Sequence, residues 1–282
     1  MFPFRLVLLL GCGLGLQVSL HAAAGAEEAA PTRRPNILFV FTDDQSWRTL
    51  SCYRDERAWP WVQTPNIDRL AREGVRFTHA YGASWCSPSR ACVLTGLLPH
   101  GIEGLHMRST CDTDYDPQVC RFWPAELRKA GYRTAHIGKW HLSYDAGYGR
   151  DWDHSVCYFH CDWQGDVYND QPLAIDGAPP KLVKGYSTDL FTDYAVDFIK
   201  KSQAQPWCLW LCYVAPHLPN TVAPRHRERY TGADVPIPSD VFGPFTGKPH
   251  YVREQHYWER GRCTVEIQGP SGVMTAGKEP RF

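Results

Sequence analysis

Two groups of residues in this 282-residue sequence have side chains that could do chemistry. The string Cys86-Ser-Pro-Ser-Arg90 places a cysteine, a strong nucleophile when ionised, four residues before an arginine. The pair Asp43-Asp44 follows an apolar run after a single threonine, and carboxylates are the hard oxygen ligands that calcium takes. Each group also has a plainer interpretation. A cysteine before Ser and Pro suits a buried helix start, and an isolated Asp pair often lies in a loop or caps a helix.

Basic side chains follow at two later points of the chain. Lys139 and His141 belong to the string Gly-Lys-Trp-His, and His217 belongs to the string Ala-Pro-His-Leu-Pro. A lysine is a compact positive charge that could neutralise an anionic oxygen. A histidine could accept or donate a proton near neutral pH. Taken singly, each of these residues could equally be a surface or structural residue.

These residues need elements that hold them together, and the sequence predicts alternating strands and helices. Continuous apolar runs predict buried strands, and segments opened by Pro or closed by Gly predict helices. The predicted strands are residues 36–41, 75–80, 134–137 and 207–214, and the predicted helices are residues 66–73, 87–95, 123–130 and 188–201. This alternation indicates an α/β fold with helices layered on a mainly parallel, mixed sheet. Ligands bind such sheets at the carboxyl ends of the strands, where Asp43 and Asp44 fall.

Taken together, the strings resemble the sulfatase family. Its signature is Cys-x-Pro-Ser-Arg followed by Thr-Gly, and all of its specified positions lie within the eleven residues that end at Gly96. The Asp pair after an opening strand, Gly-Lys-Trp-His and Pro-His-x-Pro resemble further segments of the family. The resemblance covers residues 35–225 and implies an alkaline-phosphatase/sulfatase-like catalytic domain there. The implied reaction is hydrolysis of sulfate esters, on a sulfated carbohydrate or an aryl sulfate.

The resemblance also implies a modified nucleophile. In this family the cysteine is oxidised to formylglycine by a formylglycine-generating enzyme, and the modification motif here is Cys86, Ser87, Pro88, Ser89 and Arg90. The aldehyde becomes a geminal diol in water. One hydroxyl attacks sulfur to give a covalent sulfo-enzyme intermediate, and the other then expels sulfate.

The remaining matches imply charge around that nucleophile. Arg90 would hold the formylglycine hydroxyl, and Lys139 would neutralise a sulfate oxygen. His141 would act as the base for sulfate release. His217 would contact the sulfate and help to protonate the leaving oxygen.

A divalent-cation site is implied as well. Asp43, Asp44 and the modified Cys86 would bind Ca²⁺, or alternatively Mg²⁺. Sulfatases complete this site with a second acidic or amide pair on a later strand, followed by a further lysine, and the sequence matches neither. The only aspartates after His217 are Asp234 and Asp240, and each lies in a proline-flanked stretch with no preceding strand.

The sequence therefore predicts a fold that is incomplete at the C-terminus, with residues 226–282 forming an irregular tail. The chain would be a truncated or frame-altered sulfatase, or a minimal relative that completes its site by oligomerisation. Two other functions stay open. One is a phosphonate or phosphate monoester hydrolase of the same superfamily, and the other is an inactive, exported binding protein.

Composition and the first residues favour an exported protein. Thirty basic residues balance 30 acidic ones, which argues against a nucleic-acid-binding protein. Residues 1–24, with Arg5 before an apolar run, predict a signal peptide, and no other segment predicts a membrane span. The expected compartment is periplasmic, secreted or lysosome-like.

Export makes disulfides possible. The plausible bridges are Cys111 with Cys120 and Cys157 with Cys161. A zinc site built from Cys157, Cys161, His154 and His160 is the alternative. Cys208 and Cys212 fall in an apolar run and are expected in the core.

Two further expectations concern single side chains. His136 is among the histidines expected in loops or on the surface. Trp47, Trp85 and Trp152 are among the tryptophans that either line a sugar-binding cleft or belong to the core or its rim.

Overall fold

The computed structural model describes residues 34–56, 62–83, 85–102, 120–161, 166–229, 247, 266–269 and 272–275. Contacts divide the chain into residues 1–34 and residues 35–282, and all elements below belong to the second unit. The predicted signal peptide, Cys111, Asp234 and Asp240 lie outside the described residues. Within the described part of the chain, no helix is both long and apolar enough to cross a membrane.

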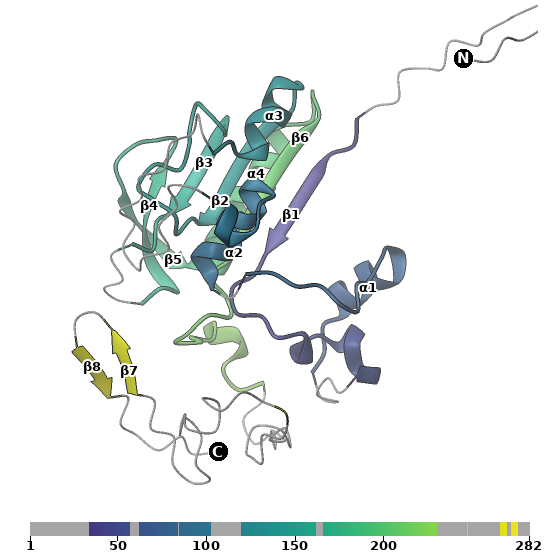
Figure 1. The fold of residues 1–282 in the computed structure, drawn as a ribbon, viewed down its shortest axis with the longest axis vertical. Coiled ribbons are helices and arrows are strands. Elements are labelled where there is room, and N and C mark those ends of the chain that lie inside the picture. Colours follow the sequence, from purple (N-terminus) through teal and green to yellow (C-terminus); the bar gives the residue numbers. More distant parts are fainter. Residues whose placement is uncertain are drawn as a thin grey trace, which may run out of the picture. The chain divides into compact units, whose positions relative to one another are not determined.

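A six-stranded mixed sheet organises the fold, in the order β1-β6-β2-β3-β4-β5 (Figure 1). Its parallel part comprises β1 (Ile37–Phe41), β6 (Trp207–Cys212), β2 (Arg133–Lys139) and β3 (His154–Tyr158). The strands β4 (Asn169–Ile175) and β5 (Lys181–Tyr186) continue the sheet in antiparallel pairing. Because β1, β6 and β2 are parallel neighbours, their carboxyl ends meet at one edge of the sheet.

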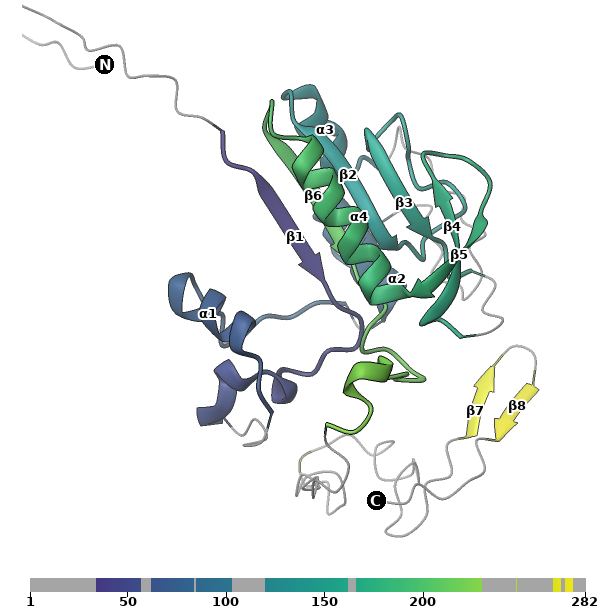
Figure 2. The ribbon, with the colours of Figure 1, turned by 180° about the vertical axis from the view of Figure 1, so that it is seen from behind.

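Helices cover both faces of this sheet. The helices α2 (Cys86–Thr95) and α3 (Trp123–Lys129) lie on one face, and α4 (Ser187–Lys201) covers the other (Figure 1, Figure 2). The helix α1 (Pro65–Glu73) contacts the 3-10 helix η2 (Ser51–Glu56), where the Ser51 hydroxyl donates to the Asp68 carboxylate at 2.7 Å. The other 3-10 helices are η1 (Trp47–Thr49), η3 (Pro99–Gly101) and η4 (Pro224–His226).

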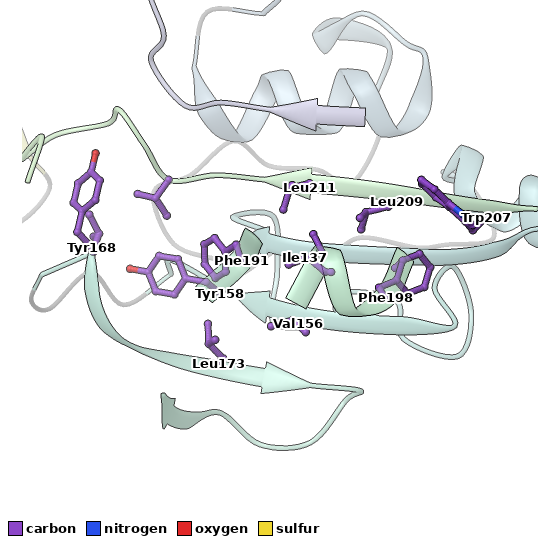
Figure 3. Packing of buried hydrophobic residues seen from close by; sticks show 14 residues of the cluster. Ile137, Val156, Tyr158, Tyr168, Leu173, Phe191, Phe198, Trp207, Leu209 and Leu211 are labelled. Atoms are coloured by element: carbon purple, nitrogen blue, oxygen red, sulfur yellow. The ribbon is translucent and has the colours of Figure 1, made fainter. Parts of the chain in front are cut away.

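Side chains alternate across the strands and so build a separate core on each face of the sheet. On the face covered by α4, Ile137 and Leu209 pack against Phe191 and Phe198 of the helix (Figure 3). The opposite core is rich in tryptophan, and its largest members are Trp140, Trp152 and Trp210. The apolar runs in β2 and β6 thus reflect burial on both faces, as expected for inner parallel strands.

Most predicted elements are confirmed, with boundaries shifted by a few residues. The strands at residues 36–41, 134–137 and 207–214 correspond to β1, β2 and β6, and the four predicted helices correspond to α1, α2, α3 and α4. The strand predicted at residues 75–80 is wrong. Val75 and Phe77 are largely exposed, so this short apolar run has no sheet to join.

The strands β3, β4 and β5 are absent from the sequence prediction. The outer strand β5 and its neighbour β4 pair in antiparallel fashion and have exposed positions, and β4 contains Pro172, so neither has the apolar run of a central parallel strand. The tail is also more regular than predicted. The strands β7 (Glu266–Gly269) and β8 (Gly272–Thr275) pair as an antiparallel hairpin, with two residues between them as is common for hairpins.

The cysteines depart from the expected bridges. Cys161 is disulfide-bonded, but Cys157 is a buried thiol beside Cys212, so the predicted bridge between Cys157 and Cys161 is wrong. The cause is the strand geometry, because Cys157 points from β3 into the tryptophan-rich core. Cys120 is likewise a buried thiol, and its pKa is raised by desolvation, so it does not form the expected bridge with Cys111. Cys208 and Cys212 are fully buried, which confirms their place in the core.

The expectation that His136 lies in a loop or on the surface is wrong. His136 is a fully buried residue of β2, and its ring lies 5.1 Å from Trp140, 5.8 Å from Trp152 and 5.3 Å from Trp210, measured between ring centroids. The alternation of β2 turns His136 toward this face and its neighbours Ala135 and Ile137 toward the other.

Candidate active site

The predicted site residues converge at the carboxyl ends of β1, β2 and β6. Asp43 follows β1, Lys139 ends β2, and His217 follows β6. Backbone hydrogen bonds extend the pairing beyond the strands, since the Asp43 N–H donates to the carbonyl of Ala215 at 3.2 Å. The His141 N–H likewise donates to the carbonyl of Phe159 at 3.0 Å. The sheet therefore fixes the backbone on which these side chains are mounted.

Asp43, Lys139 and Arg90 form a buried cluster of charges. The Lys139 Nζ lies 2.6 Å from Asp43 Oδ2, and the Arg90 Nη2 lies 3.4 Å from the same oxygen. Arg90 Nη1 also donates to the Lys139 carbonyl at 2.7 Å, and the guanidinium lies 5.2 Å from the centroid of the Phe41 ring. Both cationic side chains are 0% exposed, so one carboxylate serves two buried cations.

Burial and charge oppose each other within this cluster. Burial alone would raise the pKa of Asp43, but Lys139 and then Arg90 outweigh it, and the pKa lies below its usual range. For Lys139, burial lowers the pKa, while the Asp43 charge counteracts part of that shift. The cluster carries an excess of positive charge in a region of low dielectric, which is a favourable place for an anion.

Cys86 is the first residue of α2 and is half-buried. It lies close enough to Lys139 for the two groups to interact electrostatically. The Ser89 hydroxyl donates to the carbonyl of Ala83 at 2.8 Å, and Pro88 is buried. Gly96 ends the helix in the left-handed conformation, with φ 71°, which is why a glycine suits that position. The motif thus places Cys86 at a fixed helix start beside the cluster.

Two predicted histidines complete the group. Burial, followed by the charges of Lys139 and Arg90, lowers the pKa of His141 to about 3. His217 Nδ1 lies 2.7 Å from the carbonyl oxygen of Leu218. Because a carbonyl only accepts, Nδ1 carries the proton, and Nε2 is left facing Asp44 Oδ2 at 3.8 Å. His141 is therefore a neutral base at ordinary pH, and Nε2 is the ring nitrogen of His217 that the Leu218 carbonyl does not hold.

The sequence of this chain matches a known family model. Residues 35–253 match the family described as Sulfatase. The chain belongs to the sulfatase family. This confirms the resemblance on which the site residues were predicted.

Named sulfatases match most of this chain, while the chain spans less than half of each of them. An N-acetylglucosamine-6-O-sulfatase of Bacteroides thetaiotaomicron is 35% identical over 240 residues, which is 84% of this chain and 40% of the relative. A human N-acetylglucosamine-6-sulfatase is 31% identical over 252 residues, covering 83% of this chain and 42% of the relative. A solved structure in complex with its substrate D-glucosamine-2-N,6-O-disulfate is similar with a TM-score of 0.67 and 36% identity, over 79% of this chain and 42% of that one.

The sequence prediction did not place three further side chains next to this cluster, although it considered one of them, His160, as a zinc ligand. His160 lies against both His141 and His217, with ring centroids 4.6 Å and 5.6 Å away. Tyr158 shares a hydrogen bond with His160, and the Tyr168 hydroxyl donates to the carbonyl of His217. All three come from β3 or the segment that leads into β4, which the sequence pattern did not predict to be part of the sheet.

The tryptophans considered for a sugar-binding cleft fall into two classes. Trp152 is fully buried in the core, so it cannot contact a substrate. Trp85 is 72% exposed and directly precedes Cys86, and Trp47 is also partly exposed. An exposed aromatic face beside Cys86 is suited to packing on a sugar ring.

The two carboxylates are donors that calcium prefers, but in the described part of the chain they do not complete a metal site. Asp43 Oδ2 is already held by Lys139, and the Asp44 side chain is 61% exposed. No group of three or more His, Cys, Asp or Glu side chains in the described residues is arranged to hold a metal ion. Calcium takes about six to eight oxygen ligands, so Asp43 and Asp44 would need further donors to hold it.

Proposed function

We propose that this chain carries the nucleophile and the charge-neutralising groups of a sulfatase that hydrolyses sulfate esters on sugars. The buried cluster of Asp43, Lys139 and Arg90 beside the start of α2 is the observation that carries the proposal. Because the chain spans 40% and 42% of two named relatives, the activity of the whole protein is itself part of the proposal. We propose export through residues 1–24 and modification by a formylglycine-generating enzyme as its prerequisites.

Converted to formylglycine, position 86 would supply two hydroxyls on one carbon, one to attack sulfur and one to release sulfate. Lys139 and Arg90 would lower the cost of bringing an anionic sulfate next to that position, because their charge exceeds that of Asp43. Neutral His141 would accept the proton of the hydroxyl that releases sulfate. The imidazolium form of His217, whose Nδ1 proton is held by the Leu218 carbonyl, would deliver its second proton from Nε2 to the leaving oxygen.

The substrate class that we propose is a 6-O-sulfated amino sugar. Relatives named N-acetylglucosamine-6-sulfatase and the similar structure bound to D-glucosamine-2-N,6-O-disulfate support a sugar over an aryl sulfate. Exposed Trp85 beside Cys86 is consistent with a sugar ring at the site. A phosphate or phosphonate monoester is the second candidate, since the same cluster would also attract a phosphoryl group.

The test begins with the state of Cys86. The chain is produced together with a formylglycine-generating enzyme, and the peptide that carries Cys86 is analysed by mass spectrometry. Turnover of N-acetylglucosamine 6-sulfate and of the matching 6-phosphate is then compared. We expect an aldehyde at position 86 and faster turnover of the sulfate.

The variant Cys86→Ala should lose all turnover. Cys92→Ala is the matched control, because Cys92 lies on the same helix but outside the charge cluster, and it should keep its activity. An unmodified thiol in the active wild-type chain, or turnover that survives Cys86→Ala, would refute the proposed mechanism. Faster turnover of the phosphate would favour the second candidate.

A further inference from the structure

Three histidine rings lie in a row at the carboxyl edge of the sheet. The rings of His141 and His160 have centroids 4.6 Å apart and planes at 87° to each other. The rings of His160 and His217 have centroids 5.6 Å apart and planes at 81°. His160 is therefore the middle ring, in edge-to-face contact with both histidines to which proton transfer is assigned.

His160 is held tightly in this place. It is a buried residue with φ 58°, so the chain turns back at this point after β3. Its Nδ1 shares a hydrogen bond of 3.1 Å with the hydroxyl of Tyr158, whose ring belongs to the core under α4. Burial raises the pKa of Tyr158 to about 12, so this hydroxyl keeps its proton. Packing on one side and a hydrogen bond on the other fix the orientation of the His160 ring.

The rings of His141 and His217 make fewer hydrogen bonds to fix their orientation than their backbones do. His141 is tied by its backbone to Phe159, and its ring Nδ1 is buried without a hydrogen-bond partner in the described part of the chain. His217 is held by Leu218 at one nitrogen and lies in a loop beyond β6. Both rings contact His160, so this shared neighbour links the orientation of one ring to that of the other.

We propose that His160 is a positioning residue of the sulfatase site, whose ring keeps the rings of His141 and His217 in the relative orientation that proton transfer requires. The proposal rests on the proposed function for its kinetic consequence. His160 itself transfers no proton. Its burial lowers its pKa to about 2, so it stays neutral between the two rings and adds no repulsive charge.

Two variants separate the ring from its nitrogens. His160→Phe keeps an aromatic ring in the row and removes both nitrogens, whereas His160→Gln keeps a group that can bond to the Tyr158 hydroxyl and removes the ring. We expect His160→Gln to lower kcat by roughly tenfold or more with little change in KM, because small misplacements of catalytic groups have effects of this size. His160→Phe should stay within about threefold of wild type.

A measurement without turnover keeps the test independent of the proposed function. The ring ¹⁵N signals of His141 and His217 should shift in His160→Gln and stay near the wild-type positions in His160→Phe. His154→Phe is the control, because His154 lies at the other end of β3 and bonds to Asp176 at 2.9 Å. It should change neither kcat nor these signals.

The possible outcomes distinguish the two proposals. If wild type shows no turnover, the proposed function fails, and the ring signals alone decide the role of His160. Equal losses in His160→Phe and His160→Gln would mean that a nitrogen of His160 acts in the reaction, which overturns positioning by the ring. Unchanged kcat and unchanged ring signals in both variants would overturn it as well.

Discussion

Two adjacent residues, Asp43 and Asp44, show how strongly the surroundings decide what a carboxylate does. The Asp43 side chain is almost fully buried between Lys139 and Arg90, and it compensates both charges. The Asp44 side chain is mostly exposed, and its nearest ionisable partner is His217 at 3.8 Å. The sequence presents them as an equivalent pair, while the structure makes one of them part of the core.

This contrast predicts a large difference in stability between two similar variants. Asp43→Asn should lower the free energy of unfolding by about 3–5 kcal/mol, because it leaves buried cations uncompensated. Asp44→Asn should change it by no more than about 0.5 kcal/mol, since Asn tolerates the φ of 60° at this exposed position. Urea unfolding near pH 7 measures both. Equal stabilities of the two variants would contradict the role of Asp43 as the counter-charge.

The sequence predicted individual site residues wherever they belonged to a specific string. Cys86, Arg90, Lys139, His141 and His217 were all predicted in this way, and the structure brings them together. His160 belongs to no such string, and the sequence suggested it only as a zinc ligand, because the neighbouring strand β3 was not predicted. Its contacts depend on the pairing of β3 with β2, which only the folded sheet establishes.

Among the elements, β2 explains both what sequence reasoning found and what it missed. Its apolar residues Ala135 and Ile137 made the strand predictable, but they lie on one face of the sheet. The polar residues His136 and Lys139 are equally buried, because helices cover both faces. The strands β4 and β5 were not predicted at all, because they are half-exposed and lack an apolar run. Hydrophobic patterning therefore predicts the inner strands. It does not predict which polar residues of those strands are buried, because that burial depends on the helices that cover the sheet.

The burial of His136 in β2 predicts a dependence of stability on pH. Burial, followed by the charge of Arg90, lowers the pKa of His136 to about 3, whereas an unfolded histidine has a value of about 6.5. The unfolded chain therefore binds the proton first, and stability should be complete above pH 6.5 and fall as the pH drops toward 3. Burial of His141 and His160 acts in the same direction.

The variant His136→Phe isolates the contribution of His136 to the pH dependence of stability. Below pH 6 its stability should depend less steeply on pH than that of wild type, by up to about 1.4 kcal/mol per pH unit. Urea unfolding at several pH values between 5 and 8 gives both slopes. Comparing slopes removes any constant packing cost of the phenyl ring. A variant with the wild-type slope would show that His136 is protonated in the folded state.

For the molecule as a whole, the sheet is covered unevenly. The helix α4 packs on β2 and β6, but on the same face Leu38 and Val40 of β1 are 49% and 48% exposed. Within the described residues β1 is an outer strand that pairs only with β6. An outer strand with an open apolar face and unpaired backbone groups is a template for association.

We therefore predict that this chain self-associates at micromolar concentrations through β1. Val40→Lys should shift the population toward monomer, because a charge on an outer strand opposes pairing. Val222→Lys is the matched control, since Val222 is also 49% exposed but lies in a loop. Light scattering coupled to size-exclusion chromatography measures the mass. A monomeric wild type, or equal effects of both substitutions, would contradict an interface at β1.

The burial of Arg90 also determines whether Cys86 is modified before or after the chain folds. Pro88 and Arg90 are buried against the sheet in the folded protein, and they belong to the motif through which a modifying enzyme would recognise Cys86. A second protein cannot contact side chains that the core encloses. Under the proposed function, oxidation of Cys86 has to finish before α2 packs onto the sheet, so the speed of folding limits the fraction of molecules that ever acquire the nucleophile.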